Sequence, residues 1–213
     1  MYVQKLFEEP RVDVLHEMIA AHPLGTLVTL TADGLEANHI PLKLYPQPTP
    51  FGTLRGHVSR ENPVWRSFLP EVETLLVFQG PNTYISPTWY PSGEQSGKVA
   101  PSWSYAVVHA YGTLRIVEDG EWLMNLLEDL TNENESGRAL PWKVADAPAA
   151  FTQRMLAAIV GIEIDITRLV GKWQVGQQRP AVDRERIVQE LLLEQKDEST
   201  AMAGLVGRAI RGE

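Results

Sequence analysis

The side chains best suited to hold a ligand lie between residues 53 and 63, where an extended segment leads into a helix. Arg55, His57 and Ser59 alternate along that segment and share one face of the predicted strand. Arg60 follows, and the predicted helix begins near Asn62. Guanidinium and hydroxyl groups at such a junction suit an anion, because they donate hydrogen bonds to it and the helix N-terminus adds backbone donors. The competing interpretation is that Ser59 only caps the helix and Arg60 is solvated, and the spacing leaves both open.

A second candidate segment, KWQVGQQRP, covers residues 172–180 and is predicted to follow a strand. Amide side chains can hydrogen-bond the edge of a heterocycle, and an indole ring can stack on its face. Taken alone, the segment is more simply interpreted as a surface loop that leads into a helix. Its candidate ligand-binding residues are Lys172, Trp173, Gln174, Gln177, Gln178 and Arg179.

Several kinds of chemistry are excluded by the composition. The chain has no cysteine, which rules out a disulfide scaffold, a zinc knuckle, an iron–sulfur site and a thiolate nucleophile. It also has no glycine-rich phosphate loop, no HExxH helix and no G-x-S-x-G elbow. The five histidines lack local metal-ligand spacing, so a metal site would need His39, His57 and His109 brought together by the fold. No catalytic residue stands out, and we expect no metal.

The charge balance is acidic, with a formal net charge of −8 at pH 7 and an isoelectric point near 5.2. Proteins that bind duplex DNA usually carry clustered lysines and arginines that neutralise phosphates, and this chain has no such cluster. Direct DNA binding is therefore not expected. The N-terminal residues lack the pattern of a signal peptide, and no apolar run approaches the ~18–20 residues of a membrane span. We expect a cytoplasmic protein with no membrane contact.

The elements that must position these side chains are mostly strands. Alternating or β-branched segments predict strands over residues 25–31, 35–45, 51–58, 74–79, 106–117 and 161–167, with a hairpin turn at residues 32–34. Helical spacing predicts helices over residues 11–21, 147–160, 180–195 and 199–211, and one around residues 122–130 that Asp119 opens. Six or seven antiparallel strands with peripheral helices predict a mainly β fold, a small barrel with α additions. We expect one domain over residues 1–213, with residues 180–213 as a C-terminal helical extension.

Four finer expectations follow from local sequence. Pro41 has no N–H for a sheet ladder, which predicts an edge strand or a bulge. The short helix near Asn62 is expected to bury Trp65 and Phe68. The apolar run at residues 74–79 indicates a strand buried on both faces. Ile162, Ile164 and Ile166 alternate and are expected to point inward.

The chain as a whole resembles the PaiB-like family of FMN-binding negative transcriptional regulators, a branch of the FMN-binding split β-barrel superfamily. The resemblance rests on NHIPL at residues 38–42, GHVSRENPVW at residues 56–65 and KWQ…QQRP at residues 172–180. It rests also on YISPTWY at residues 84–90 with VAPSWSY at residues 99–105. These stretches span most of the chain and agree with the family in order, spacing and residue type.

The resemblance implies a homodimer of two split barrels with FMN in the groove between the subunits. It implies an FMN phosphate near Ser59 and Arg60, with Arg55, His57 and Asn62 nearby. It also implies that residues 172–179 approach the flavin from the partner chain. Trp173 and Gln174 resemble a tryptophan–glutamine pair near the C-terminus of the pyridoxamine-phosphate oxidases. The chain departs from the family tail at two positions, where Gly176 replaces a serine and Gln178 replaces an asparagine.

Three functional hypotheses stay open at the level of sequence. The first is an FMN-binding transcriptional regulator of the PaiB-like type. The second is a flavin-dependent oxidoreductase that acts on a small molecule, with FMN supplying the redox chemistry. The third keeps the barrel and replaces FMN with haem, for which His39, His57 or His109 would be the axial ligand.

Overall fold

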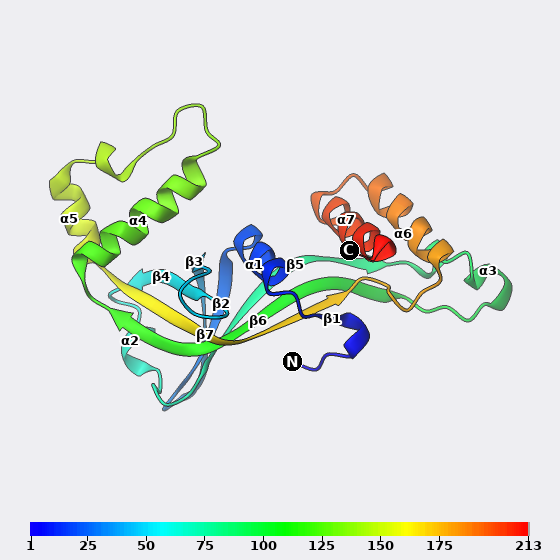
Figure 1. The fold of residues 1–213 in the computed structure, drawn as a ribbon, viewed down its shortest axis with the longest axis horizontal. Coiled ribbons are helices and arrows are strands. Elements are labelled where there is room, and N and C mark those ends of the chain that lie inside the picture. Colours follow the sequence, from blue (N-terminus) through cyan, green and yellow to red (C-terminus); the bar gives the residue numbers. More distant parts are fainter. Residues whose placement is uncertain (213) are drawn as a thin grey trace. The chain divides into compact units, whose positions relative to one another are not determined.

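The computed structural model describes residues 1–212, apart from the side chains of residues 95 and 96, and consists mainly of an antiparallel sheet (Figure 1). Its strands are β1 (Glu8–Glu9), β2 (Leu24–Thr31), β3 (Gly34–Tyr45), β4 (Thr53–Ser59), β5 (Thr74–Ile85), β6 (Ser102–Val117) and β7 (Ile159–Gln174). They pair in the order β1-β7-β4-β3-β2-β5-β6, and β6 pairs again with β7. The strands β2 to β7 therefore close into a barrel, which confirms the predicted split β-barrel class.

Helices complete the chain, as the sequence predicts. They are α1 (Val12–Ala21), α2 (Val64–Ser67), α3 (Gly93–Ser96), α4 (Gly120–Glu135), α5 (Ala149–Ala157), α6 (Ala181–Leu193) and α7 (Asp197–Arg211), with short 3-10 turns at Lys5–Phe7, Pro87–Trp89 and Val144–Asp146. The Asp119 carboxylate accepts a hydrogen bond from the Trp122 backbone N–H at 2.7 Å and so caps α4. The start of α4 near Asp119 is confirmed.

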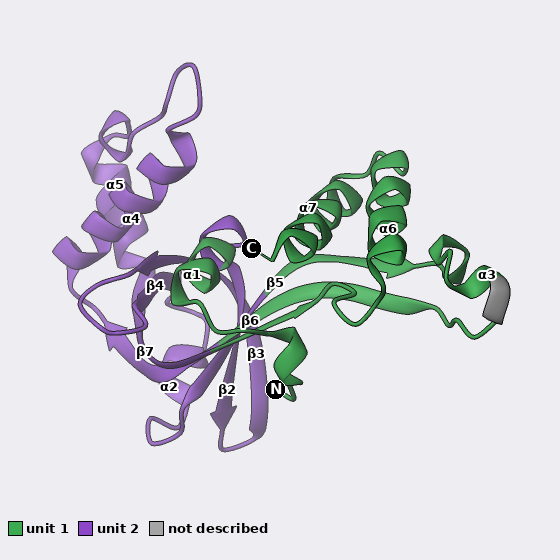
Figure 2. Cartoon of the chain, turned by 45° about the vertical axis from the view of Figure 1, so that its right-hand side comes forward, with its two compact units in different colours: residues 1–18, 79–109, 170–213 green, residues 19–78, 110–169 purple. Residues whose placement is uncertain are grey.

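Two compact units make up the described chain (Figure 2). Unit 1 comprises residues 1–18, 79–109 and 170–213, and unit 2 comprises residues 19–78 and 110–169. The three longest connections between them are continuous strands, because β5, β6 and β7 each begin in one unit and end in the other. A single domain over residues 1–213, of which residue 213 lies outside the described part, stays a prediction.

The core of unit 2 is built from side chains that alternate along the barrel strands. Ile162, Ile164 and Ile166 are each at most 3% exposed, which confirms their inward orientation. Burial of each such side chain stabilises the fold by about 1.5–3 kcal/mol. Because Gly56 pairs with Ile162 in the antiparallel β4–β7 ladder, the opposite face of β4 carries Arg55.

Unit 1 is held together at both ends of the chain. The two-residue strand β1 pairs with the end of β7, with Glu8 opposite Lys172. Helices α6 and α7 pack against each other through buried apolar residues that include Leu191 and Met202. The carboxylate of Asp183 is fully buried and accepts hydrogen bonds from the Ser92 backbone N–H (3.0 Å) and hydroxyl (2.6 Å), which tie α6 to the loop before α3.

One local expectation about strands is met only in part, and another is wrong. The sequence predicts an edge strand or a bulge at Pro41: β3 as a whole lies between β2 and β4, but only its residues 42–45 pair with β4. Pro41 ends the pairing with β2, and the pairing with β4 begins only at Leu42, so the proline stands where one ladder replaces the other. Residues 74–79 are not buried on both faces: Thr74, Leu76 and Phe78 are buried, whereas alternate residues face partly outward.

Two further expectations need correction. Val64 is the fully buried residue of α2, while Trp65 and Phe68 are only half-buried, because a single helical turn presents one face to the barrel. Helix α5 ends at Ala157 and β7 begins at Ile159, two residues before the predicted stop at Gly161. The same strand continues to Gln174, so part of the predicted tail loop is strand.

Candidate functional site

A groove of about 410 Å³ opens on unit 2 where β3, β4 and the start of β7 meet. Its volume lies within the range of about 300–1,000 Å³ that is typical of small-molecule sites. No aspartate, glutamate, lysine or arginine lines it. The lining residues are Asn38, His39, Ile40, Pro41, His57, Val58, Ser59, Asn62, Ala158 and Ile159.

His57 lines this groove and also has a buried ring nitrogen. Its Nδ1 atom is buried and has no hydrogen-bond partner within the described residues. Such an atom is costly to leave unpaired, and buried polar groups in proteins almost always have a partner. Burial lowers the pKa of His57, so the imidazole is neutral at pH 7 and offers one donor and one acceptor.

Asn62 and Ser59 form the polar end of the groove. The Asn62 side-chain N–H donates to Asn38 Oδ1 at 2.8 Å, and Asn62 Oδ1 accepts from the Val64 backbone N–H at 2.9 Å. The cap of α2 is thus supplied by Asn62. Ser59 Oγ accepts from the Glu61 backbone N–H at 3.2 Å, which leaves the hydroxyl proton of this exposed side chain for another acceptor.

Arg60 does not line the groove but holds one of its walls. Its Nε donates to the Ala157 carbonyl at 3.1 Å, and Nη2 donates to the Ile159 carbonyl at 3.2 Å. The remaining Nη1 pairs with Glu118 at 2.6 Å. These bonds cross the junction between α5 and β7, whose residues 158 and 159 form the wall. Arg60 is therefore a positioning residue in this structure, not a solvated side chain.

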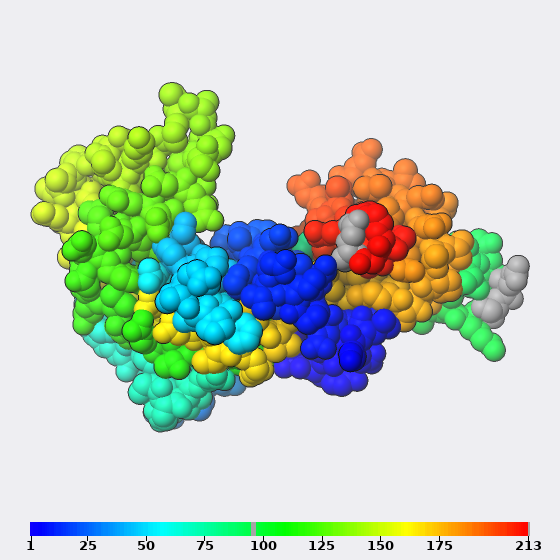
Figure 3. Space-filling model, viewed as in Figure 1, coloured from blue at the N-terminus to red at the C-terminus, as the bar shows by residue number. Residues whose placement is uncertain are grey.

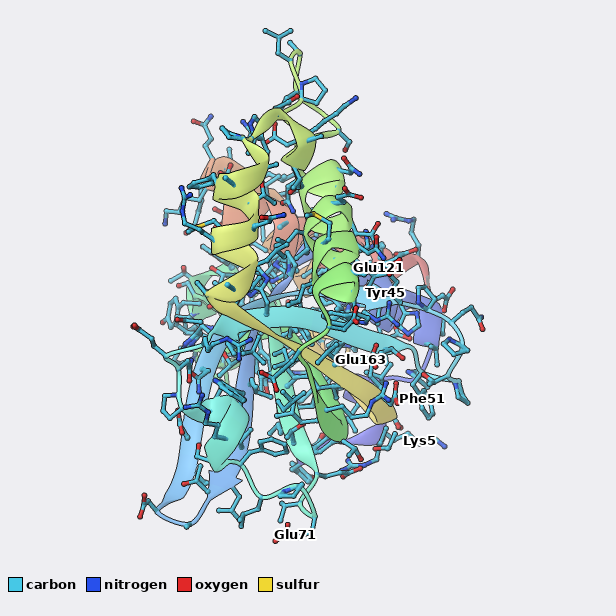
Figure 4. All side chains as sticks on the ribbon, turned by 90° about the vertical axis from the view of Figure 1, so that its left-hand side faces the viewer. Lys5, Tyr45, Phe51, Glu71, Glu121 and Glu163 are labelled. Atoms are coloured by element: carbon cyan, nitrogen blue, oxygen red, sulfur yellow. The ribbon has the colours of Figure 1, made fainter. Side chains whose placement is uncertain are left out.

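Arg55 is engaged on a different face, beneath α4. Its Nε donates to Glu163 at 2.6 Å, and Glu163, only 3% exposed, also pairs with Arg115. The guanidinium carbon of Arg55 lies 4.5 Å from the centre of the Tyr45 ring. The Tyr45 hydroxyl donates to Asp129 of α4 at 2.5 Å, and Figure 4 shows Tyr45 and Glu163 near the foot of that helix. Arg55 thus joins α4 to the barrel and does not line the groove.

The tail residues 172–174 belong to β7 in unit 1. Trp173 is only 9% exposed, so its ring packs inside unit 1. The Lys172 ammonium lies 5.1 Å from the centre of the Tyr105 ring, a cation–π geometry. Gln174 Nε2 donates to the Trp103 carbonyl at 3.2 Å. Lys172 and Gln174 are half-buried and keep part of their surface toward solvent.

The turn after β7 is stabilised by its own side chains. Gln177 Oε1 accepts from the Val175 N–H at 2.9 Å, and its Nε2 donates to the Trp173 carbonyl at 2.5 Å. Gly176 has φ +82°, a conformation that favours glycine over serine. Arg179 stacks on the Tyr90 ring at 4.1 Å, and Gln178 is exposed. The cavity beside this turn has about 20 Å³, little more than one water needs.

Of the eleven predicted binding residues, the structure brings His57, Ser59 and Asn62 together in one groove. Arg55 and Arg60 are near in sequence but make other bonds. The six tail residues belong to unit 1. Their role in binding stays a prediction. The groove also contains Asn38 and His39, which were not among the predicted FMN ligands although the NHIPL motif marked their segment.

Within residues 1–212, no three histidine, aspartate or glutamate side chains are grouped as metal ligands. Among the helices of this described part, none has both the length and the apolar character that crossing a membrane requires.

Comparison with protein families identifies the chain. The model of the FMN_bind_2 family, described as "Putative FMN-binding domain", matches residues 1–168. The chain belongs to the FMN_bind_2 family. The predicted FMN cofactor is confirmed through this membership, and the groove fits a flavin because it combines a suitable volume with neutral polar groups.

Two curated proteins and one solved structure are similar to this chain. The chain is 28% identical to "Protease synthase and sporulation protein PAI 2" of Bacillus subtilis, over 97% of this chain and 96% of that protein. It is 30% identical to "Uncharacterized protein AN0679" of Emericella nidulans, over 88% and 89%. The FAD and heme binding protein from Mycobacterium smegmatis shares the fold at 16% identity, with a TM-score of 0.59 over 78% of this chain and 73% of that one. The PaiB-like resemblance is confirmed.

Proposed function

We propose that this protein is a homodimeric, cytoplasmic FMN-binding regulator, and that the flavin lies in the groove around His57. The observation that carries this proposal is the groove itself, which has a volume of about 410 Å³, is lined by His57, Ser59 and Asn62, and has no charged side chain among its lining residues. A flavin ring is flat and uncharged along most of its surface, with donors and acceptors at its edge. Neutral amide, imidazole and hydroxyl groups against aliphatic walls match that chemistry.

The residues in and around the groove have different roles in binding FMN. His57 hydrogen-bonds the cofactor, and the Ser59 hydroxyl donates to a phosphate oxygen at the exposed end. Asn38 holds the Asn62 amide in place, and Arg60 keeps the wall at residues 158 and 159 in position. When bound, FMN supplies one- or two-electron redox chemistry.

The same groove lining favours a regulatory role over turnover of a substrate. The two histidines are its only titratable side chains, and no acid–base pair within it is poised to work on a substrate. The Bacillus subtilis relative carries a name that refers to protease synthase and sporulation, which are cellular processes. The net charge of −8 favours an action through a protein partner over direct contact with DNA.

The first test is an absorbance spectrum of the purified protein, with mass spectrometry of whatever denaturation releases. We expect flavin bands and released FMN. A Soret band would show that the protein binds haem in place of FMN. His39, His57 and His109 would then be the candidate axial ligands. Absence of any chromophore, even after incubation with added FMN, would overturn the flavin proposal.

A second test separates regulation from catalysis. NADH or NADPH is added to the FMN-loaded protein under anaerobic conditions, and bleaching of the flavin is followed against free FMN. We expect no bleaching beyond that of free FMN. Repeated reduction and reoxidation with a donor and an acceptor would make the protein an oxidoreductase. A mobility shift of promoter DNA at low salt would contradict the indirect mode of regulation.

A further inference from the structure

Unit 1 contains a cavity of about 170 Å³ that shares no lining residue with the flavin groove. Its walls come from the N-terminal segment, the end of β7 and helix α7, and Figure 3 shows the blue N-terminal segment and the red C-terminal helix on the same face. A cavity needs only about 10–15 Å³ to hold one water, so this one has room for a small organic molecule. The lining residues are Glu8, Glu9, Arg11, Val14, Trp173, Val175, Gln177, Leu205, Arg208 and Ala209.

Three polar side chains of this cavity are already satisfied within the chain. Arg11 donates hydrogen bonds to the buried Glu9 carboxylate from Nε at 2.8 Å and from Nη2 at 2.7 Å. Its backbone N–H donates a third hydrogen bond at 3.0 Å. The side-chain amide of Gln177 is hydrogen-bonded to the backbone of residues 173 and 175. Glu9 and Gln177 therefore have little left to offer a ligand, and Arg11 is held against Glu9 by an ion pair.

Two charged side chains of opposite sign remain. Within residues 1–212, neither Glu8 nor Arg208 has a side-chain hydrogen bond or ion pair. Both are exposed and stand at the rim of the cavity. The apolar part of the lining comes from Trp173, Val14 and Val175, together with Leu205.

We propose that this cavity binds a small carboxylate with an apolar body. A guanidinium presents two parallel N–H groups that match the two oxygens of a carboxylate, so Arg208 is the anchor. The apolar body lies against Trp173 and the aliphatic wall, where it is removed from water. Glu8 adds a negative charge to the lining of the same cavity, and a ligand with an α-ammonium group, such as an apolar amino acid, engages both charges. This proposal does not depend on the bound flavin.

The test uses three probes that share one carbon skeleton: isocaproate has only the carboxylate, leucinol has only the amine with a hydroxyl, and L-leucine has both charges. Binding to the purified full-length protein is measured by isothermal titration calorimetry, with the thermal midpoint as a second readout. We expect leucine, isocaproate or both to bind and raise the midpoint, and leucinol to have no effect. Binding of leucine alone would identify an amino acid site that needs Glu8. Binding of isocaproate would identify a simple acid site.

Variants test which side chains of the cavity bind the probes. Arg208→Gln should weaken binding of the carboxylate probe at least tenfold, and Glu8→Gln should weaken leucine without weakening isocaproate. Arg186→Gln is the matched control, because Arg186 lies on α6 of the same unit and pairs with Glu190 away from the cavity. Circular dichroism verifies that each variant is folded. The proposal is overturned if neither carboxylate binds at millimolar concentration, or if Arg208→Gln and Arg186→Gln bind equally well.

Discussion

At the scale of single residues, His57 differs from the other polar residues of the groove, because one of its ring nitrogens has no hydrogen-bond partner within the described residues. Its neighbours Ser59 and Asn62 each hold a backbone or side-chain partner, whereas the buried Nδ1 of His57 has none within the described chain. A buried polar atom without a partner raises the free energy of the protein by about 1–3 kcal/mol. His57 both lines the groove and carries this buried atom, which makes it the most informative residue to change.

Replacement of His57 by glutamine tests its contact with the flavin. We expect His57→Gln to weaken FMN binding about 5- to 30-fold, which corresponds to one lost hydrogen bond of about 1–2 kcal/mol. The measurement is quenching of FMN fluorescence on titration with protein. His22→Gln is the control, because His22 belongs to the same unit and does not line the groove. Equal affinities of the two variants would contradict the assignment.

The burial of His57 also predicts a dependence of stability on pH. Burial lowers its pKa in the folded protein below the ordinary value of 6.5. Between the two pKa values the unfolded chain binds more protons, so the free energy of unfolding falls as the pH drops through 6.5. We expect the urea midpoint to decrease between pH 7.5 and pH 5.5, and the decrease to be smaller in His57→Gln. An identical decrease in both proteins would assign the effect to other groups.

Gly176 is a residue whose backbone matters more than its side chain. With φ +82° it occupies a region that an alanine enters at a cost of about 1 kcal/mol, although the nearest atom to an added Cβ is 4.0 Å away. We expect Gly176→Ala to lower the free energy of urea unfolding by about that amount. Gly204→Ala is the contrasting variant, since Gly204 lies within α7 with open space around it and should gain about 0.5–1 kcal/mol. A stable Gly176→Ala would mean that the turn rearranges.

At the scale of elements, the junction between α5 and β7 is built by a residue from β4's end. Arg60 binds the carbonyl groups of Ala157 and Ile159, and its backbone N–H donates to the Ala158 carbonyl at 2.8 Å. The chain reverses there from helix to strand and exposes carbonyl groups that a helix end cannot satisfy by itself. The groove wall therefore depends on a side chain that does not line the groove.

Removal of this support should act on stability and on FMN together. We expect Arg60→Gln to lower the free energy of unfolding by about 1–2 kcal/mol, since two hydrogen bonds of a half-exposed side chain are lost. FMN affinity should fall as well, and Arg60→Lys should not restore it, because one ammonium cannot reproduce the fork of a guanidinium. Arg154→Gln on the exposed face of α5 is the control. If Arg60→Lys restores both quantities, the charge alone is what matters.

At the scale of the whole molecule, the proposed homodimer accounts for tail residues that do not line the groove of unit 2. Lys172, Gln174 and Gln178 keep exposed or half-exposed polar groups in unit 1, although each of them resembles a family position at the flavin. Closed twofold assemblies let a residue of one subunit complete a site of the other. In the proposed homodimer, the tail would serve the partner's flavin rather than its own.

The dimer is tested by its concentration dependence. Light scattering behind a sizing column is expected to give twice the chain mass of 23.8 kDa. Dilution that dissociates the dimer should release FMN in parallel, because mass action links the two equilibria. Lys172→Ala should weaken FMN without altering the mass. A monomer that binds FMN as tightly as the undiluted protein would remove the need for a partner.

The sequence by itself determined the barrel strands, the capped helix α4 and the segment that carries the groove. Local periodicity and capping depend on neighbouring residues in the sequence. The inward orientation predicted for Ile162, Ile164 and Ile166 is therefore found in the structure. Only the tertiary structure decided what Arg55 and Arg60 do, because a long charged side chain takes the partner that the fold brings near it. Glu163 and Glu118, remote in sequence, occupy the guanidinium groups that local spacing had offered to a phosphate. The tertiary structure also buried the Nδ1 of His57 without a partner among residues 1–212, which no local pattern records.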